Sequence, residues 1–80
     1  MQKEEAKIHL VNISNKIHEL EHKLLQKKQF YRETLKTLEG RDYSEVFEEA
    51  LDVYKKLESA ICFAKEEFAK YQKKYKNLFV

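Results

Sequence analysis

The chain of 80 residues contains no proline and a single glycine, Gly40. Proline and glycine are the residues that most often mark turns, so their near-absence leaves little material for a β-sheet and its connections. The absence of a glycine-rich loop also removes the usual backbone cradle for a phosphate group. Charged residues make up 38% of the sequence, which suits long helices with one face in water. The composition therefore predicts an all-α protein.

Cysteine and long apolar runs are also scarce. The single cysteine, Cys62, excludes an internal disulfide, and no recognisable catalytic neighbour accompanies it. No apolar run approaches the roughly 20 residues that a membrane-spanning helix needs. The opening segment MQKEEAKIHL lacks the apolar centre of a secretory signal. These features predict a cytoplasmic protein without a membrane span.

The chain has no large excess of charge of either sign. Sixteen basic and fourteen acidic residues give a formal charge of +2, which is too close to balance to favour nucleic-acid binding by charge alone. The segment 70–76, KYQKKYK, does mix lysine with tyrosine, a composition that can contact phosphates and stack on bases. Burial of Tyr71 and Tyr75 would remove that stacking platform. Nucleic-acid binding is therefore the minor alternative for this segment.

The most informative feature that is present is a continuous series of apolar and aromatic side chains in the second half. They alternate at spacings of four and three residues: Tyr43, Phe47, Ala50, Tyr54, Leu57, Ile61, Ala64, Phe68, Tyr71, Tyr75 and Leu78. This heptad spacing is typical of a helix whose face is covered by another helix. The first half carries a similar series: Leu10, Ile13, Ile17, Leu20 and Leu24, resumed at Tyr31, Leu35 and Leu38. We call the two series the seam.

The segment around Gly40 separates the two halves of the seam. Gly40 can adopt the left-handed conformation that closes a helix, and Asp42 can cap the next helix, with Glu45 completing a capping box. We predict a single domain over residues 1–80, with a helix over about 3–39, a turn at 40–42 and a helix over about 43–78. So short a connection makes the helices antiparallel. The expected fold class is an all-α, coiled-coil-like two-helix hairpin.

The charges on the two halves favour the same topology. Antiparallel pairing sets basic residues opposite acidic ones at both ends: Lys28, Arg32 and Lys36 against Glu45, Glu48, Glu49 and Asp52, and Glu4 and Glu5 against Lys73, Lys74 and Lys76. An exposed pair contributes only about 0.2–1 kcal/mol, so these charges select orientation more than they stabilise the fold.

Lys27 and Lys28 interrupt the seam of the first helix. This break marks a local polar layer, a contact with a partner or a shift in packing.

The second helix carries more apolar surface than one neighbouring helix can cover. Val46, Val53, Ala60 and Phe63 lie beside the seam, and Leu51 lies on its other side. A face this wide fits a three- or four-helix bundle, completed by self-association or by a partner. The five Tyr and five Phe also suit an interface. We call Val46, Val53, Ala60 and Phe63 the flank and predict that it faces a partner. The alternative is an ordinary intramolecular core whose tyrosines are partly exposed to solvent.

One motif in the first helix resembles a metal site. Residues 18–22, HELEH, match H-E-x-x-H, in which two histidines bind zinc and the glutamate activates a water. A catalytic zinc needs a third protein ligand and a cleft, yet no histidine follows His22. Ser14, Ser44 and Ser59 lack a nucleophile elbow. We therefore expect no catalytic residue, no cofactor and no metal site.

At Leu57-Glu58-Ser59-Ala60-Ile61 the chain resembles the small E-component co-chaperones of bacterial type III secretion needles. Those proteins are cytoplasmic helical hairpins with a turn at a comparable distance upstream. They join a larger helical-repeat chaperone to hold the needle subunit soluble before export. The resemblance implies a non-catalytic binding role without a cofactor, with a larger helical chaperone or an export substrate as partner.

A second similarity is to the WXG-type hairpins of type VII secretion, which place a glycine turn at the midpoint. Leu38-Glu39-Gly40 occupies the motif position, but the tryptophan is missing. The pattern Tyr54-x-x-x-Glu58 lies inside the second helix, whereas an export signal of that form should follow the hairpin.

These observations lead us to expect a non-catalytic helical protein–protein interaction module that forms a homo- or hetero-oligomer, with a secretion co-chaperone as the specific hypothesis. One alternative is a homodimeric four-helix bundle acting as a nucleic-acid-binding or regulatory adaptor, and a second is a WXG-like secreted hairpin. The expected anchors of the contact between the helices are Leu57, Ile61, Phe68 and Phe47, facing Ile13, Ile17, Leu20 and Leu24.

Overall fold

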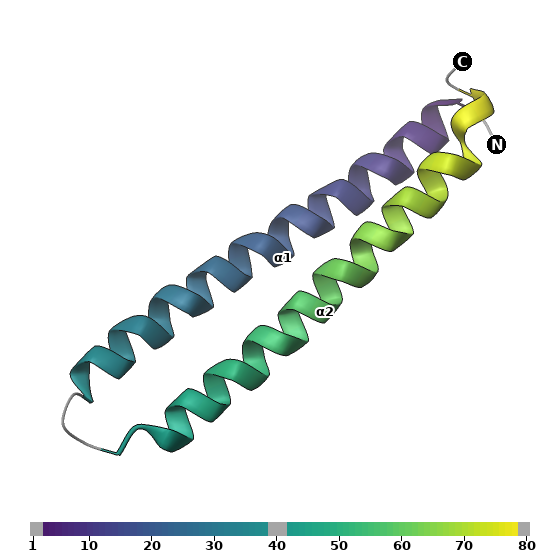
Figure 1. Ribbon diagram of the computed structural model, residues 1–80. Helices are drawn as coiled ribbons and strands as arrows, with labels where there is room; N and C mark the ends of the chain where they lie inside the picture. Colours follow the sequence, from purple (N-terminus) through teal and green to yellow (C-terminus); the bar gives the residue numbers. More distant parts are fainter. Residues whose placement is uncertain (1–2, 39–41, 79–80) are drawn as a thin grey trace.

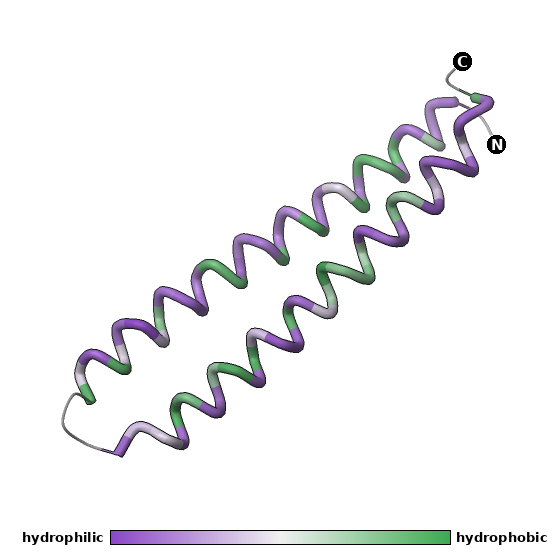
Figure 2. The backbone as a smooth tube through the Cα atoms, in the orientation of Figure 1, coloured by the Kyte–Doolittle hydropathy of each residue, from purple (hydrophilic) through white to green (hydrophobic). Residues whose placement is uncertain are grey.

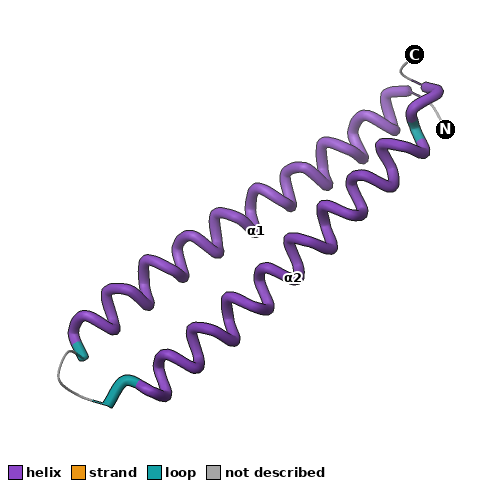
Figure 3. Tube along the Cα trace, in the orientation of Figure 1, coloured by secondary structure: helices purple, strands orange, loops and turns teal. Residues whose placement is uncertain are grey.

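The structure is a computed structural model that describes residues 3–38 and 42–78. It contains two long helices, α1 (Lys3–Thr37) and α2 (Ser44–Lys74), and a short 3₁₀ helix, η1 (Lys76–Leu78). The two long helices run antiparallel side by side, and the start of α1 lies at the same end as η1 (Figure 1). No strand occurs in the described part of the chain (Figure 3). The predicted all-α helical hairpin is therefore confirmed.

Ring contacts at two levels define how the helices are aligned. The rings of Tyr31 and Tyr54 lie 5.9 Å apart at nearly a right angle, and those of His9 and Tyr75 also lie 5.9 Å apart. Because both helices rise by about 1.5 Å per residue, this alignment sets Leu38 level with Phe47. The rod that results measures 59 × 15 × 14 Å.

The core is thin. Hydrophobic segments recur along the whole length of both helices (Figure 2), yet few of their side chains are buried. Among the described residues the buried ones are Ala6, Ile13, Tyr31, Ala50, Ile61, Ala64 and Tyr75. Three of these are alanines, which let the helices approach closely but remove little apolar area from water. The hairpin therefore gains limited stability from its own core.

The start of α2 differs from the expected capping box. α2 begins at Ser44, and the preceding Tyr43 makes no side-chain capping hydrogen bond. Instead, the Ser44 backbone N–H donates to the Asp42 carboxylate over 3.0 Å, and the Ser44 hydroxyl donates to the same oxygen over 2.7 Å. These bonds favour the ionised carboxylate and hold the pKa of Asp42 below its ordinary value. Asp42 thus acts one residue further from the helix than predicted, and Glu45 completes no box. Gly40 lies outside the described residues.

Both helices end before the predicted boundaries. The Leu38 N–H donates to the carbonyl groups of Thr34 and Leu35, at 3.2 and 3.3 Å, so the last turn of α1 tightens after Thr37. At the end of α2, the Leu78 N–H donates to the Tyr75 carbonyl over 2.9 Å, three residues back. Such bonds define a 3₁₀ turn, so the continuous α-helix expected to about residue 78 ends at Lys74.

The expected ion pairs between the helices do not form among the described residues that were predicted to make them. The one ion pair between described side chains that the structure defines lies within α2, where the Lys56 ammonium is 3.1 Å from the Asp52 carboxylate. Lys28 instead places its ammonium 5.9 Å from the centre of the Tyr54 ring. This outcome agrees with the small favourable free energy of an exposed ion pair, which does not exceed the entropy cost of ordering two long side chains.

Candidate interaction surfaces

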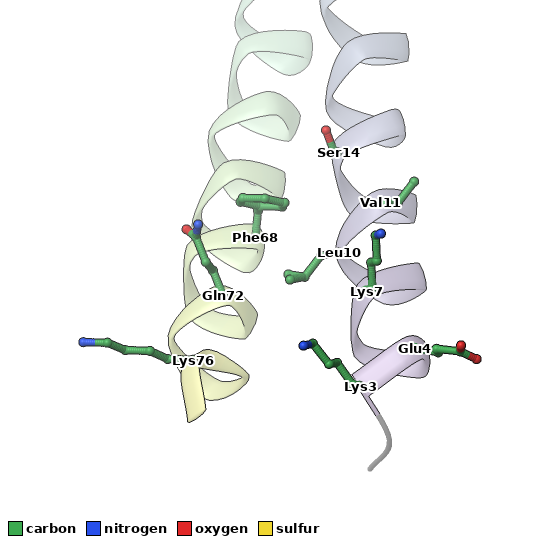
Figure 4. Close-up of a pocket in the computed structure, with 9 residues that line it drawn as sticks. All are labelled: Lys3, Glu4, Lys7, Leu10, Val11, Ser14, Phe68, Gln72 and Lys76. Atoms are coloured by element: carbon green, nitrogen blue, oxygen red, sulfur yellow. The ribbon is translucent and has the colours of Figure 1, made fainter. Parts of the chain in front are cut away.

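A hollow lies between the helices at the open end of the hairpin. It has a volume of about 830 Å³, and Leu10 of α1 and Phe68 of α2 point into the space between the helices (Figure 4). Polar side chains surround this apolar floor: Lys3, Glu4, Lys7, Ser14, Gln72 and Lys76. Val11 completes the lining from the outer side of α1. We call this hollow the outer section.

A second hollow of similar volume, about 820 Å³, lies nearer the middle of the rod. Its apolar lining comes from both helices: Leu24, Leu25, Ile61, Cys62 and Ala69. Its charged lining has a different balance, with three glutamates and two lysines: Glu21, Glu58, Glu66, Lys28 and Lys65. We call this hollow the inner section.

The two sections lie along one side of the hairpin. On α1 the lining residues Lys7, Leu10 and Ser14 are followed, seven residues further on, by Glu21, Leu24 and Lys28. On α2 the lining residues 58, 62, 65, 69, 72 and 76 are spaced by three and four. Residues with heptad spacing share one face of a helix. The two sections therefore lie on one face of the hairpin, along residues 3–28 of α1, and we refer to them together as the groove.

The predicted flank lies on the opposite side of the seam from the groove. Relative to Ile61, Ala60 is turned by about 100° in one direction and Cys62 by about 100° in the other, because a helix turns by that angle per residue. Val46 and Val53 of the flank are half-buried, whereas Ala60 is exposed and Phe63 is 71% exposed. The structure thus leaves half of the predicted partner-facing flank open to solvent.

The seam residues are buried unequally within the single chain. Ile13, Ile61 and Tyr75 are buried, and a larger group is half-buried: Leu10, Ile17, Leu20, Leu24, Tyr54, Leu57, Phe68 and Tyr71. Phe47, an expected anchor, is 46% exposed. The reason is that α1 ends at Thr37, almost level with Phe47. Phe47 therefore does not anchor the contact between α1 and α2.

An aromatic cluster closes the open end of the hairpin. The His9 Nδ1 atom and the Tyr75 hydroxyl form a hydrogen bond of 2.9 Å between the helices. The His9 ring also meets the Tyr71 ring edge-on, with centres 4.4 Å apart, and Tyr71 stacks on Tyr75. Because Tyr75 is buried, its ring presents no free face like the one a stacked base would need. Tyr71 is half-buried, and the ammonium groups of Lys70 and Lys74 lie 5.9 and 5.7 Å from the centre of its ring.

His9 contacts α2 although it does not belong to the seam. It directly precedes Leu10 of the seam, and its own spacing from Ala6 and Ile13 is three and four residues. That spacing is the signal that could have identified it. Val11 and Leu25 line the groove although they lie outside the seam, since each directly follows a seam residue.

The lysines that interrupt the seam of α1 lie beside aromatic rings. The Lys27 ammonium is 6.0 Å from the centre of the Phe30 ring, and Lys28 makes the contact with Tyr54 described above. Both lysines are exposed. Of the three explanations for this break, the local polar layer agrees best with these positions.

The two histidines of the HELEH motif and the single cysteine are all exposed. His18 and His22 are exposed on α1, and no group of three or more His, Cys, Asp or Glu among residues 3–38 and 42–78 is arranged to hold a metal ion. The exposed Cys62 donates a long hydrogen bond, 3.8 Å, to the Glu66 carboxylate. Neither described helix is long and apolar enough to cross a membrane.

No protein-family model, curated protein or solved structure matches the chain. What can be said of its function therefore depends on the two exposed apolar surfaces, the groove and the flank.

Proposed function

We propose that this hairpin is a non-catalytic module that acts by packing its exposed apolar surfaces against helices of another protein chain. The exposure of large apolar side chains supports the proposal most directly. Among the described residues these are Ile8, Val11, Leu25, Phe30, Tyr43, Phe47, Leu51 and Phe63. Such exposure on so small a chain marks an interaction site or an aggregation hazard.

The small size of the core supports the same proposal. A domain of this length seldom obtains more than about 3–5 kcal/mol from one core, and here nearly half of the buried residues are alanines. Additional helices would cover the partly exposed leucines and aromatics of the seam. Helix association would therefore stabilise the hairpin and perform its function in one step.

The specific role that we propose is that of a small cytoplasmic co-chaperone, which shields an export substrate together with a larger helical chaperone. Its support is the resemblance over residues 57–61, which includes Ile61 of the core and Ala60 of the flank. The exposed flank beside this run offers a surface for such a chaperone.

Site-specific photo-crosslinking in the cells that produce the protein tests this proposal. The photoreactive residue replaces Phe63 on the flank and, as a matched control, His22, which is exposed on α1 at the same level of the rod and lies outside both the flank and the groove. We expect discrete protein adducts from position 63 and none from position 22. Equal labelling from both positions, or none from either, would contradict an interaction role for the flank.

A further inference from the structure

The charges along the groove change sign from one section to the other. In the outer section, Lys7 and Lys76 outnumber Glu4 even before Lys3 is counted. In the inner section, three glutamates outnumber Lys28 and Lys65. An occupant of the groove must therefore be apolar along its centre, acidic where it meets the outer section and basic where it meets the inner section.

The groove of a second copy meets this requirement. Two copies can place their grooves face to face in two ways that keep twofold symmetry. If the rods point the same way, the basic outer sections meet each other and so do the acidic inner sections. If the rods point in opposite ways, each outer section meets the inner section of the other copy. Charge therefore favours the second arrangement.

The size of the groove is sufficient for such a contact. Residues 3–28 of α1 span about 38 Å at 1.5 Å per residue, and the hairpin is 14–15 Å across. A face of this size buries roughly 550 Å² on each copy, so the pair just reaches the roughly 1,000 Å² that a specific interface needs. The dimer is thus expected to be reversible and of modest affinity.

We propose that two copies of this chain dock groove to groove with their rods antiparallel, forming a four-helix bundle that covers Leu10, Leu24, Leu25 and Phe68. This inference rests on the proposed association function and names the occupant of one of its two surfaces. The flank, on the other side of the seam, stays open for a different protein.

A distance measurement tests the orientation. Glu49 is exposed on α2 near the turn, so an E49C/C62A variant carries a single thiol for a spin label at that position, and the alanine keeps the lining of the groove apolar at residue 62. The centre of the groove on α2 is near residue 67, so antiparallel copies separate the two labels by about 55 Å along the rod. Parallel copies would hold them within about 30 Å, which is roughly the width of a four-helix bundle. A distance near the shorter value would overturn the proposal.

A pair of substitutions tests the surface. Leu25 lines the groove and is 64% exposed, and Ile8, which does not line it, is 60% exposed on the same helix. Because both side chains are mostly exposed in the single chain, Leu25→Glu and Ile8→Glu should fold alike. In sedimentation equilibrium we expect Leu25→Glu to raise the dimer dissociation constant at least tenfold, by about 1.4 kcal/mol, and Ile8→Glu to leave it unchanged.

Other outcomes overturn the inference and can be distinguished from failure of the proposed function. Equal effects of the two substitutions would show that the groove is not the interface. If the chain stays monomeric at all concentrations, a second copy does not occupy the groove. Adducts from position 63 would still support the proposed association with another protein. Loss of the dimer in Phe63→Glu alone would assign self-association to the flank.

Discussion

His9 is the residue whose side chain links the start of α1 to the end of α2. Its ring contacts both Tyr71 and Tyr75, and its Nδ1 atom shares a hydrogen bond with the Tyr75 hydroxyl. When Nδ1 carries no proton, the phenol donates to it. This hydrogen bond links a side chain at the start of α1 to one at the end of α2. It therefore contributes to the alignment of the two helices.

Removing the Tyr75 hydroxyl should weaken the fold without disturbing its packing. We expect Tyr75→Phe to lower the free energy of unfolding by about 0.5–1.5 kcal/mol, because the buried ring stays and one hydrogen bond is lost. Urea unfolding measures the change. His18→Ala is the control, since His18 is exposed on the same helix as His9 and should leave stability unchanged. Equal stability of Tyr75→Phe and the native chain would contradict the role of the bond.

Tyr31 should make the hairpin sensitive to alkaline pH. Burial raises the pKa of Tyr31 above its ordinary value of 10.0, and the neighbouring Glu49 and Tyr54 raise it further. A raised folded-state pKa gives stability that is complete below pH 10 and is lost as pH rises through the folded value. We therefore predict that native stability falls above about pH 10 more steeply than that of Tyr31→Phe. Thermal melts across pH 8 to 11 compare the two; parallel curves would contradict the prediction.

At the level of the helices, the seam predicted much of the structure. The heptad spacing correctly indicates two helices that pack against each other, because it depends on which side chains avoid water. The short connection correctly indicates that these helices run antiparallel. The ends were less predictable. Phe47 continues the spacing but lies almost level with Thr37, where α1 ends, and a 3₁₀ turn follows Tyr75 at the end of α2. Periodicity identifies a helical face and does not reveal where the opposite helix stops.

Short-range capping was harder to predict for a related reason. Asp42 was predicted to cap the second helix, but the N-cap is Tyr43, and the Asp42 carboxylate accepts hydrogen bonds from the N–H and hydroxyl groups of Ser44. A serine or aspartate near a helix start can bond to several neighbouring groups, and sequence spacing alone does not show which of them it will meet.

The seam itself can be tested at Ile61. This side chain is buried between the helices, so Ile61→Asp would bury a charge without a partner. We expect a loss of more than about 3 kcal/mol, which would leave the chain largely unfolded. Leu51→Asp is the matched control on α2, because Leu51 is 51% exposed and should tolerate the change. Circular dichroism and thermal melting measure both; native-like melting of Ile61→Asp would contradict the assignment of Ile61 to the core.

The whole molecule is a narrow rod with apolar surface on two of its sides. Composition and spacing predicted that one helix could not cover the second, and the exposed Phe63 agrees with that expectation. The groove was not foreseen, because it needs residues from both helices that come together only after folding. Val11 and Leu25 lie two heptads apart on α1, so that helix alone places them on one face, and the hairpin adds the lining residues of α2 beside them.

The dependence of stability on protein concentration tests most directly whether this rod is built to be covered by another chain. Unfolding in urea would be followed at chain concentrations from about 1 to about 100 µM, with the mass measured in parallel by sedimentation. We predict a dimer at the upper concentrations and a midpoint that rises with concentration, by up to about 1.4 kcal/mol of apparent stability for each tenfold step. A monomer with a constant midpoint and an unfolding free energy above about 5 kcal/mol would contradict it, since such a hairpin would need no partner.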